Sequence, residues 1–347
     1  MVKMKLFSKK ISDWYLLNKR DLPWRNTTDP YKIWLSEIIL QQTRVNQGLN
    51  YYHKFVEQYP TVAKLANAKE EQILKLWQGL GYYSRARNLH KAAKQVLAEH
   101  KGKFPSEYND LIKLKGVGVY TASAIASFAF NKPYAVVDGN VYRILSRIFG
   151  IDVPIDSSEG KKYFQELANQ LLNKIDSSLH NQAMMEFGAR YCTPSNPDCN
   201  NCIFQNDCLA LLKNRVSELP VKSKKSKQTI RYFNYLVICQ NKNIFIEKRI
   251  EKDIWHSLYQ FPLIESERLL DANKLIKHIG WKNIFKKNDF KLNKEYTEMK
   301  HILTHQIIYT RFWNVKYEGT LTKYLLIKRL EMNNYPLPRL IERFLQA

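Results

Sequence analysis

Apolar residues recur at helical spacing along most of residues 1–217. In SRARNLHKAAKQVLAEH (84–100) they share one face of a predicted helix, opposite a face of Arg and Lys; that apolar face holds Leu89, Ala92, Ala93, Val96 and Leu97. The segments YKIWLSEIILQQT (31–43) and NVYRILSRI (140–148) are also predicted to be helices. Asn67 is expected to cap the helix in NAKEEQILKLW, because Glu70 follows close to the position of a capping box. This region shows no convincing strand hairpin, so we predict that it is almost entirely helical.

The pattern changes after residue 217. Residues 221–229, VKSKKSKQT, contain four lysines, two serines and no acid, a composition typical of a linker. The later segments RYFNYLVIC (231–239) and WNVKYEG (313–319) are rich in β-branched and aromatic residues, and the second alternates apolar with polar positions. The sequence therefore predicts a helical region at 1–217, a basic linker at 218–229 and a smaller α+β domain at 230–347.

The charge balance is strongly basic. The 347 residues include 55 Lys and Arg against 32 Asp and Glu, a formal net charge of +23. Such an excess favours a polyanionic partner, most often nucleic acid. No apolar stretch reaches the roughly 18 residues that span a bilayer, and the first residues lack the features of a secretion signal. We therefore expect a cytoplasmic protein without a membrane partner.

Four of the five cysteines lie in one short segment, CTPSNPDCNNCIFQNDC. Cys192, Cys199, Cys202 and Cys208 follow the spacing C-x6-C-x2-C-x5-C, so four thiolates can surround one metal centre. The residues by themselves allow either tetrahedral zinc or an iron–sulfur cluster. Zinc modules often use two C-x2-C pairs, so a single pair with longer flanking loops modestly favours the larger cluster.

Two glycines interrupt the helical pattern in KLKGVGVYTASAI (113–125). The preceding SEYNDLI is predicted to be a helix capped by Ser106, so the order is helix, glycine turn, helix. Gly116 and Gly118 permit a tight turn and a close approach to a ligand, and the free N–H groups that begin the second helix suit a phosphate. These features predict a clamp on the DNA backbone. Glycine packing between two helices would explain the same pattern.

Two carboxylates are candidates for chemistry. Glu37 lies on an otherwise apolar predicted helix, where lost hydration would raise its pKa and let it act as a general acid near neutral pH. The alternative is an amphipathic helix with Glu37 in solvent. Asp138 follows an apolar run in YAVVDGNVYRI. It is expected either to stabilise a cationic transition state or simply to form a turn or helix cap.

The glycine turn, an Asp about 20 residues later and the four-cysteine run resemble the helix-hairpin-helix DNA glycosylases of the endonuclease III superfamily. Within it, residues 10–210 are similar to the adenine DNA glycosylases; the motifs that carry the resemblance, in order, are LPWR, WLSEIILQQT, LWQGLGYYSRARNLHKAA, GVGVYTA, VVDGNVYR and NQAMMEFGA. The resemblance implies a six-helix barrel, an iron–sulfur subdomain whose four cysteines hold a 4Fe-4S cluster, and a C-terminal Nudix-like α+β domain.

The resemblance also implies roles for single residues. Glu37 protonates N7 of adenine, and Asp138 stabilises the oxocarbenium-like sugar with help from Asn140 and Tyr120. The segments that shape the adenine pocket contain Trp24, Arg25 and Gln182. The residues expected to contact DNA are Gln42 and Tyr82, which insert into the base stack beside the lesion, and Gly116 and Gly118 of the turn.

Tyr120 decides which reaction is expected. Superfamily members that also cut the DNA backbone carry a lysine at this position, and its amine attacks the sugar to form a Schiff base. A phenol cannot form that imine. The sequence therefore predicts a monofunctional enzyme that leaves an abasic site, and Lys115, on the other side of the turn, is not expected to substitute.

Residues 230–347 resemble the family's C-terminal domain, which checks the opposite strand for 8-oxoguanine. The recognition loop often reads Phe-Ser-His in the family and reads Leu303-Thr304-His305 here. Thr304 therefore keeps the hydroxyl and His305 is retained, while the aromatic side chain is lost. A strand-edge histidine is the alternative interpretation of His305. The glutamate run of a working Nudix box is missing, so nucleotide hydrolysis is not expected.

The leading hypothesis is a base-excision-repair adenine DNA glycosylase of the bacterial type. It would act as a monomer on double-stranded DNA in which A is paired with 8-oxoguanine or G, and would associate with the nucleoid through that DNA. Three alternatives stay open from the sequence: a bifunctional glycosylase/lyase, a non-enzymatic iron–sulfur protein that binds DNA or senses redox state, and a zinc-binding DNA module.

Overall fold

The computed structural model describes residues 4–223, 228–285 and 290–347. They form two compact units, one from the described residues of 1–67 and 88–224 and the other from those of 68–87 and 225–347. Residues 224–227, inside the predicted linker, lie outside the described residues. The exact bounds predicted for the helical region, the linker and the α+β domain stay a prediction.

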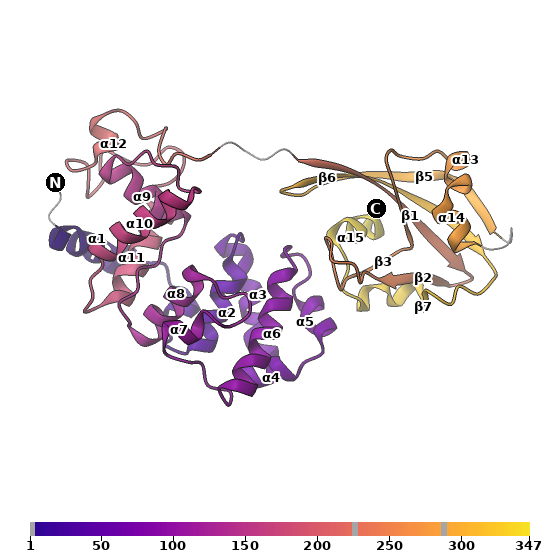
Figure 1. Cartoon of the computed structure of the whole chain (residues 1–347), viewed down its shortest axis with the longest axis horizontal. Helices are drawn as coiled ribbons and strands as arrows, with labels where there is room; N and C mark the ends of the chain where they lie inside the picture. Colours follow the sequence, from indigo (N-terminus) through magenta and orange to yellow (C-terminus); the bar gives the residue numbers. More distant parts are fainter. Residues whose placement is uncertain (1–3, 224–227, 286–289) are drawn as a thin grey trace. The chain divides into compact units, whose positions relative to one another are not determined.

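Helices dominate the chain before residue 217, as the periodicity predicts (Figure 1). Their bounds are α1 Met4–Asn18, η1 Pro23–Arg25, α2 Pro30–Leu40, α3 Val45–Gln58, α4 Val62–Asn67, α5 Glu70–Leu76, α6 Ser84–Glu99, α7 Tyr108–Leu111, α8 Val119–Phe130, α9 Gly139–Phe149, α10 Ser158–Leu171, α11 Ser177–Arg190 and α12 Leu209–Leu212. None of the described helices has the length and apolar character needed to cross a membrane.

Two of the predicted helix caps are wrong. Asn67 is the last residue of α4, and α5 is instead preceded by Lys69, whose backbone N–H donates to the side-chain oxygen of Gln72. Helix α7 begins at Tyr108 after Glu107, because the Ser106 hydroxyl donates to the Glu107 carboxylate and caps no helix. Local cap signals are weak, and burial of apolar residues decides where these short helices begin.

Helix α2 packs against α3 and α8 in the first unit. Asp29 caps it by accepting the N–H of Tyr31, and Pro30 occupies its first turn, where no backbone donor is needed. Every residue from 33 to 39 is buried. Because the helix is enclosed on all sides, any polar side chain in its middle is removed from bulk water.

A second core joins α1, α9, α10, α11 and α12. Its largest fully buried side chains are Phe7, Phe164, Phe187 and Phe204. Cys208 belongs to this core, and Cys192 and Cys202 pack against it. The cysteine segment is therefore anchored to the same helices that carry Asp138 and Gln182.

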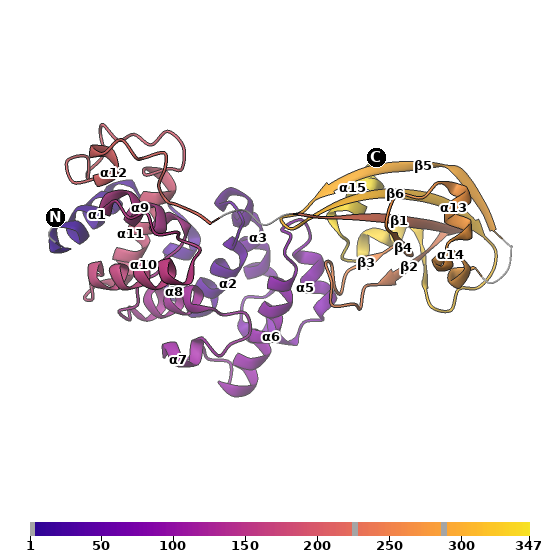
Figure 2. The same cartoon turned by 45° about the horizontal axis from the view of Figure 1, so that its top comes forward.

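The second unit contains a mixed seven-stranded sheet. Its elements are β1 Thr229–Gln240, β2 Asn243–Lys248, β3 Tyr259–Gln260, β4 Leu263–Ser266, α13 Ala272–Lys277, α14 Ile279–Ile284, β5 Phe290–Ile302, β6 Gln306–Tyr317, β7 Leu325–Lys328, η2 Arg329–Asn334 and α15 Arg339–Gln346. Strand β1 runs parallel to β6 and antiparallel to β2 and β4. Strands β5 and β6 form a hairpin beside it, with residues 303–305 at its tip (Figures 1 and 2).

Both faces of this sheet are covered. In β1, Phe233 and Tyr235 join a core that includes Leu340 of α15, whereas Leu236 joins a separate core with Trp281 of α14. Successive side chains of a strand point to opposite faces, so the near-continuous apolar run of β1 reflects burial on both sides.

Candidate active site

The predicted catalytic residues lie at one cavity of the first unit, with a volume of about 530 Å³. Glu37 comes from α2, Tyr120 from the first turn of α8, and Asp138 precedes α9. The other predicted residues on its wall are Trp24, Arg25, Gln42, Asn140 and Gln182. The fold thus gathers residues from positions 24 to 182 around a space large enough for one base.

Glu37 is buried, with 7% of its surface exposed. Loss of hydration raises its pKa from 4.5 to about 7, and the charge of Asp138 adds to the rise, while a hydrogen bond from Tyr120 and the charge of Arg25 oppose it. The predicted rise is confirmed, and the alternative of a solvent-exposed Glu37 is wrong. The side chain can therefore carry a proton near neutral pH.

The Tyr120 hydroxyl donates a hydrogen bond of 2.7 Å to Glu37 Oε2. Burial raises the pKa of this phenol well above its ordinary value, and the nearby carboxylates raise it further, so it stays protonated and remains a donor. The sequence pointed to Asp138 as the residue that Tyr120 assists. Its hydrogen bond runs to Glu37, since α8 packs against α2, and the help that Tyr120 gives to Asp138 stays a prediction.

Asp138 caps helix α9. Its carboxylate accepts the N–H groups of Asn140 at 2.9 Å and Val141 at 2.8 Å, and the Asn140 side-chain amide at 2.7 Å. Burial raises the pKa of Asp138, and these hydrogen bonds act against that rise by stabilising the carboxylate. The capping interpretation is confirmed, and it leaves the side chain on the wall of the cavity.

Glu186 is a fully buried carboxylate on the same wall and was not among the residues predicted from the sequence. It accepts hydrogen bonds from Arg20 at 2.6 and 2.7 Å and from Arg25 at 2.6 Å. Burial by itself would raise its pKa, but these two guanidinium groups outweigh it and lower the pKa to about 2. Its position four residues after Gln182, on the same helix face, is the signal that could have found it.

The two glycines of the turn differ in what they do. Gly116 has a φ of +78°, and a Cβ there would lie 2.6 Å from Cβ of Asn88, so turn geometry and packing both require glycine. Gly118 has a φ of −98° and would have no atom within 4 Å of an added Cβ. The open space lies at the N-terminus of α8, where N–H groups lack intrahelical partners.

Gln42 and Tyr82 share an unusual backbone conformation. Each is exposed and non-glycine, with φ values of +55° and +47°. Such residues concentrate at functional sites, where surrounding structure holds them in place. Tyr82 belongs to the second unit, and within that unit its hydroxyl lies 2.5 Å from the Thr304 hydroxyl. Thr304 and His305 are exposed at the β5–β6 tip.

The four clustered cysteines line one small cavity. Burial, followed by the neighbouring thiols, raises the pKa of the Cys202 thiol to about 12, and the Arg147 guanidinium lies 3.5 Å from Cys192 Sγ. Among the described residues, no group of three or more His, Cys, Asp or Glu side chains has an arrangement that could hold a single metal ion. The four cysteines nevertheless line this one cavity beside Arg147, and thiolate sulfur is the donor that an iron–sulfur cluster uses.

Comparison with known proteins defines the class. Residues 35–171 match the HhH-GPD superfamily of base excision DNA repair proteins, and residues 234–347 match the NUDIX domain. A thermostable thymine-DNA glycosylase is 30% identical with a TM-score of 0.56, over 60% of this chain and 97% of that one. Endonuclease III in a non-covalent DNA complex shares the fold at 21% identity and a TM-score of 0.53, over 62% and 99%. The chain is a DNA glycosylase of the helix-hairpin-helix class.

Full-length relatives narrow this class. An adenine DNA glycosylase of Buchnera aphidicola (subspecies Baizongia pistaciae) is 36% identical over 312 residues, 88% of this chain and 84% of the relative. Adenine DNA glycosylases of Arabidopsis thaliana and Homo sapiens are 34% and 41% identical, over 84% and 59% of this chain and 54% and 39% of theirs. The chain belongs to the adenine DNA glycosylase family of base excision repair. The predicted helical core and Nudix-like domain are confirmed, and the non-enzymatic alternative is wrong.

Proposed function

We propose that this enzyme removes adenine paired with 8-oxoguanine or G by hydrolysis of the N-glycosidic bond and leaves an abasic site. It acts as a monomer on duplex DNA of the bacterial nucleoid, in the cytoplasm. The observation that carries the proposal is the hydrogen-bonded pair of Glu37 and Tyr120 beside Asp138, inside a cavity that admits a flipped base.

Base release begins with the proton on Glu37. A carboxyl with a pKa of about 7 donates to N7 of the extruded adenine near neutral pH, so the base leaves as a neutral molecule when its bond to the sugar breaks. The Tyr120 hydroxyl stabilises the carboxylate that results. Water then adds to the sugar carbon, and Glu37 can take up the proton that this water releases.

Asp138 stabilises the positive charge that develops on the sugar. Hydrogen bonds from Asn140 and from the Val141 N–H favour its ionised form, and they hold the side chain at one position on the wall. A preorganised carboxylate of this kind stabilises charge without reorganisation at the moment of reaction. Asn140 therefore acts through Asp138.

The remaining wall suits adenine in particular. The ionised Glu186 and the amide oxygen of Gln182 are acceptors for the exocyclic amine of adenine, whereas guanine carries a carbonyl oxygen at that ring position. Arg25 is held beside them by its hydrogen bond to Glu186, and the buried ring of Trp24 adds an apolar surface. A carbonyl oxygen placed against these acceptors would be repelled by them, which disfavours guanine.

The absence of an amine at position 120 supports hydrolysis without strand cleavage. Lys115 is exposed before the turn, its backbone N–H donates to Gln95, and it is not among the residues that line the cavity of Tyr120. Without an imine between enzyme and sugar, the product is an abasic site.

Thr304 and His305 are proposed to contact the opposite base. In 8-oxoguanine N7 carries a hydrogen that guanine lacks, and a hydroxyl oxygen such as that of Thr304 can accept it. The exposed hairpin tip and the nearby Tyr82 hydroxyl support this role. The four cysteines are in turn proposed to hold a 4Fe-4S cluster, which would cross-link the two ends of their loop.

The test uses a duplex with one A paired with 8-oxoguanine. We expect adenine release with strand scission only after alkali, and no covalent capture by borohydride. Glu37→Gln should lower the single-turnover rate at least about 100-fold, with affinity for the duplex largely kept, while Glu57→Gln, an exposed acid on α3, serves as the matched control. Scission without alkali would instead support the glycosylase/lyase alternative, and undiminished release by Glu37→Gln would exclude Glu37 as the acid.

A further inference from the structure

The second unit contains another cavity, with a volume of about 580 Å³, that the chemistry of base release does not use. Two loops of the C-terminal domain form much of its wall. One is the segment 250–258, which contributes Trp255, and the other is the β5–β6 tip with Leu303, Thr304 and His305. The cavity therefore combines an aromatic side chain with hydroxyl and imidazole groups.

Trp255 is held in a costly backbone conformation. Its φ is +59°, in the left-handed region, which a bulky residue adopts only where the surrounding structure imposes it. The indole is only partly buried. Its ring contacts Phe233 at 6.2 Å and His301 at 5.7 Å between centroids. One side of the ring is thus supported by the sheet, while the residue still lines the cavity.

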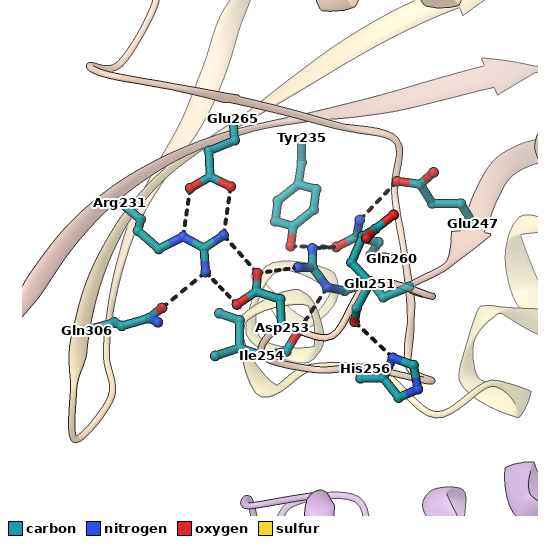
Figure 3. A network of polar contacts seen from close by, with 11 residues as sticks. Arg231, Tyr235, Glu247, Glu251, Asp253, Ile254, His256, Gln260, Glu265 and Gln306 are labelled. Carbon is teal, nitrogen blue, oxygen red and sulfur yellow. Dashed lines mark hydrogen bonds and ion pairs between the residues drawn. The ribbon is translucent and has the colours of Figure 1, made fainter.

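A cluster of ionic contacts fixes the loop that carries Trp255. Asp253 is bound by Arg231 of β1 at 2.8 Å and by Arg249 at 2.9 Å, and Arg249 Nε also donates to the Ile254 carbonyl at 3.0 Å. Figure 3 shows Arg231 between Glu265 and Asp253, with Gln306 on its other side. The two arginine side chains are 16% and 8% exposed, so these contacts are largely shielded from water.

The same Arg231 joins the two loops. Its Nη1 donates to Gln306 Oε1 at 3.2 Å as well as to Asp253. Gln306 follows the hairpin tip directly, and its carbonyl accepts the N–H of Leu303 at 2.8 Å. One guanidinium therefore sets the position of the Trp255 loop relative to the Thr304 tip. A site that contacts one ligand from two sides requires such a fixed geometry.

We propose that Trp255 is a specificity-determining residue whose indole stacks on the purine opposite the target adenine while the Thr304 tip reads the edge of that purine. The inference rests on the proposed function. Stacking on an aromatic side chain suits any purine, whereas a hydroxyl distinguishes 8-oxoguanine from guanine. Position 303 of the tip is leucine, and Trp255 of the other loop supplies an indole to the same cavity, which Tyr82 and Tyr83 also line. Arg231 and Asp253 are positioning residues.

The experiment compares two duplexes that carry a non-cleavable adenine analogue. In one the analogue faces 8-oxoguanine, and in the other it faces an abasic analogue with nothing to stack. Trp255→Leu is expected to lower the preference for the first duplex about tenfold, while Trp255→Phe keeps it within about threefold. Leu330→Ala, at a residue 94% exposed in the same domain, should leave the preference for the first duplex unchanged. Gln306→Ala, which removes one contact between the loops, should lower this preference about threefold.

The outcomes separate the two proposals. If wild-type enzyme binds both duplexes equally, recognition of the opposite base fails, and the inference fails with it. If wild-type enzyme prefers 8-oxoguanine but Trp255→Leu weakens binding to both duplexes equally, Trp255 is structural and the inference alone is overturned. An unchanged preference in Gln306→Ala would contradict the positioning role of the Arg231 link.

Discussion

At the scale of single residues, one cavity holds two carboxyl groups whose pKa values move in opposite directions. The pKa of Glu37 rises to about 7 because its carboxyl is buried and accepts a hydrogen bond from a neutral phenol, whereas the pKa of Glu186 falls to about 2 because two arginines bind it. One group is thereby suited to donate a proton and the other to remain an acceptor. Environment, not residue type, separates the two roles.

The pH dependence of base release tests the role of Tyr120. Its hydrogen bond favours ionised Glu37, so Tyr120→Phe should raise the pKa of Glu37. The general acid must be protonated, and the single-turnover rate should fall as the pH rises through about 7 in wild-type enzyme. In Tyr120→Phe this alkaline fall should move to higher pH. Tyr163→Phe, an exposed tyrosine on α10, is the control; an unmoved profile in Tyr120→Phe would mean that another group controls the rate.

At the scale of secondary-structure elements, the two glycines of the turn have different roles, one in packing and one in ligand binding. Gly116 faces Asn88 of α6 at close range, while Gly118 faces open space at the start of α8. The same sequence motif therefore contains one position required by packing and one available to a ligand. A DNA phosphate is the ligand that the N-terminus of α8 would favour.

Two alanine substitutions distinguish these positions. Gly116→Ala should destabilise the protein by about 1–3 kcal/mol, because of its positive φ and the contact with Asn88. Gly118→Ala should change the free energy of unfolding by less than about 0.5 kcal/mol yet weaken DNA binding, since a methyl group would occupy the approach of the phosphate. Urea unfolding and fluorescence anisotropy measure the two effects. Equal stability of both variants would contradict the structural assignment.

The cysteine loop has its own test. Purified enzyme should contain about four iron atoms per chain and absorb at about 400 nm. Cys199→Ser should lose both signals. Cys239→Ser should keep them, because Cys239 lies on β1 of the other unit. One zinc ion per chain without visible absorbance would support the zinc alternative.

At the scale of the whole molecule, the proposed function requires the DNA substrate to contact both units. The adenine cavity lies in the first, and the hairpin tip at 303–305 lies in the second. The net charge of +23 attracts DNA without regard to base sequence, whereas two of the three residues proposed to read the opposite base, Thr304 and Trp255, are uncharged. Affinity and specificity should therefore respond differently to salt.

Salt titration measures this difference. Raising the salt from about 50 to about 200 mM should weaken binding to an undamaged duplex at least about tenfold, because released counterions drive the electrostatic part of binding. The preference for a duplex with A opposite 8-oxoguanine should change less than about threefold, since neutral contacts carry it. If the affinity for undamaged DNA did not change with salt concentration, the excess of Lys and Arg would lie away from the bound DNA.

Much of the fold could be predicted because its signals are local. Short stretches of sequence contain the signals for the helix at 84–100, for strand β1 and for the cysteine cluster. The cap at Asn67 could not be predicted, because burial of Leu65 and Ala66 extends α4 through that residue. The role of Glu186 could not be predicted, because its partner Arg20 lies 166 residues earlier in the chain.

The sequence by itself determined the class of protein, the order of its motifs and the absence of an amine at position 120. Only the tertiary structure decided what the side chains do. It paired Glu37 with Tyr120 across 83 residues, and it joined Asp253 and Gln306 through Arg231. The physical reason is that a pKa or a loop position depends on burial and on the nearest charges, and the residues that supply them are neighbours in space without being neighbours in the chain.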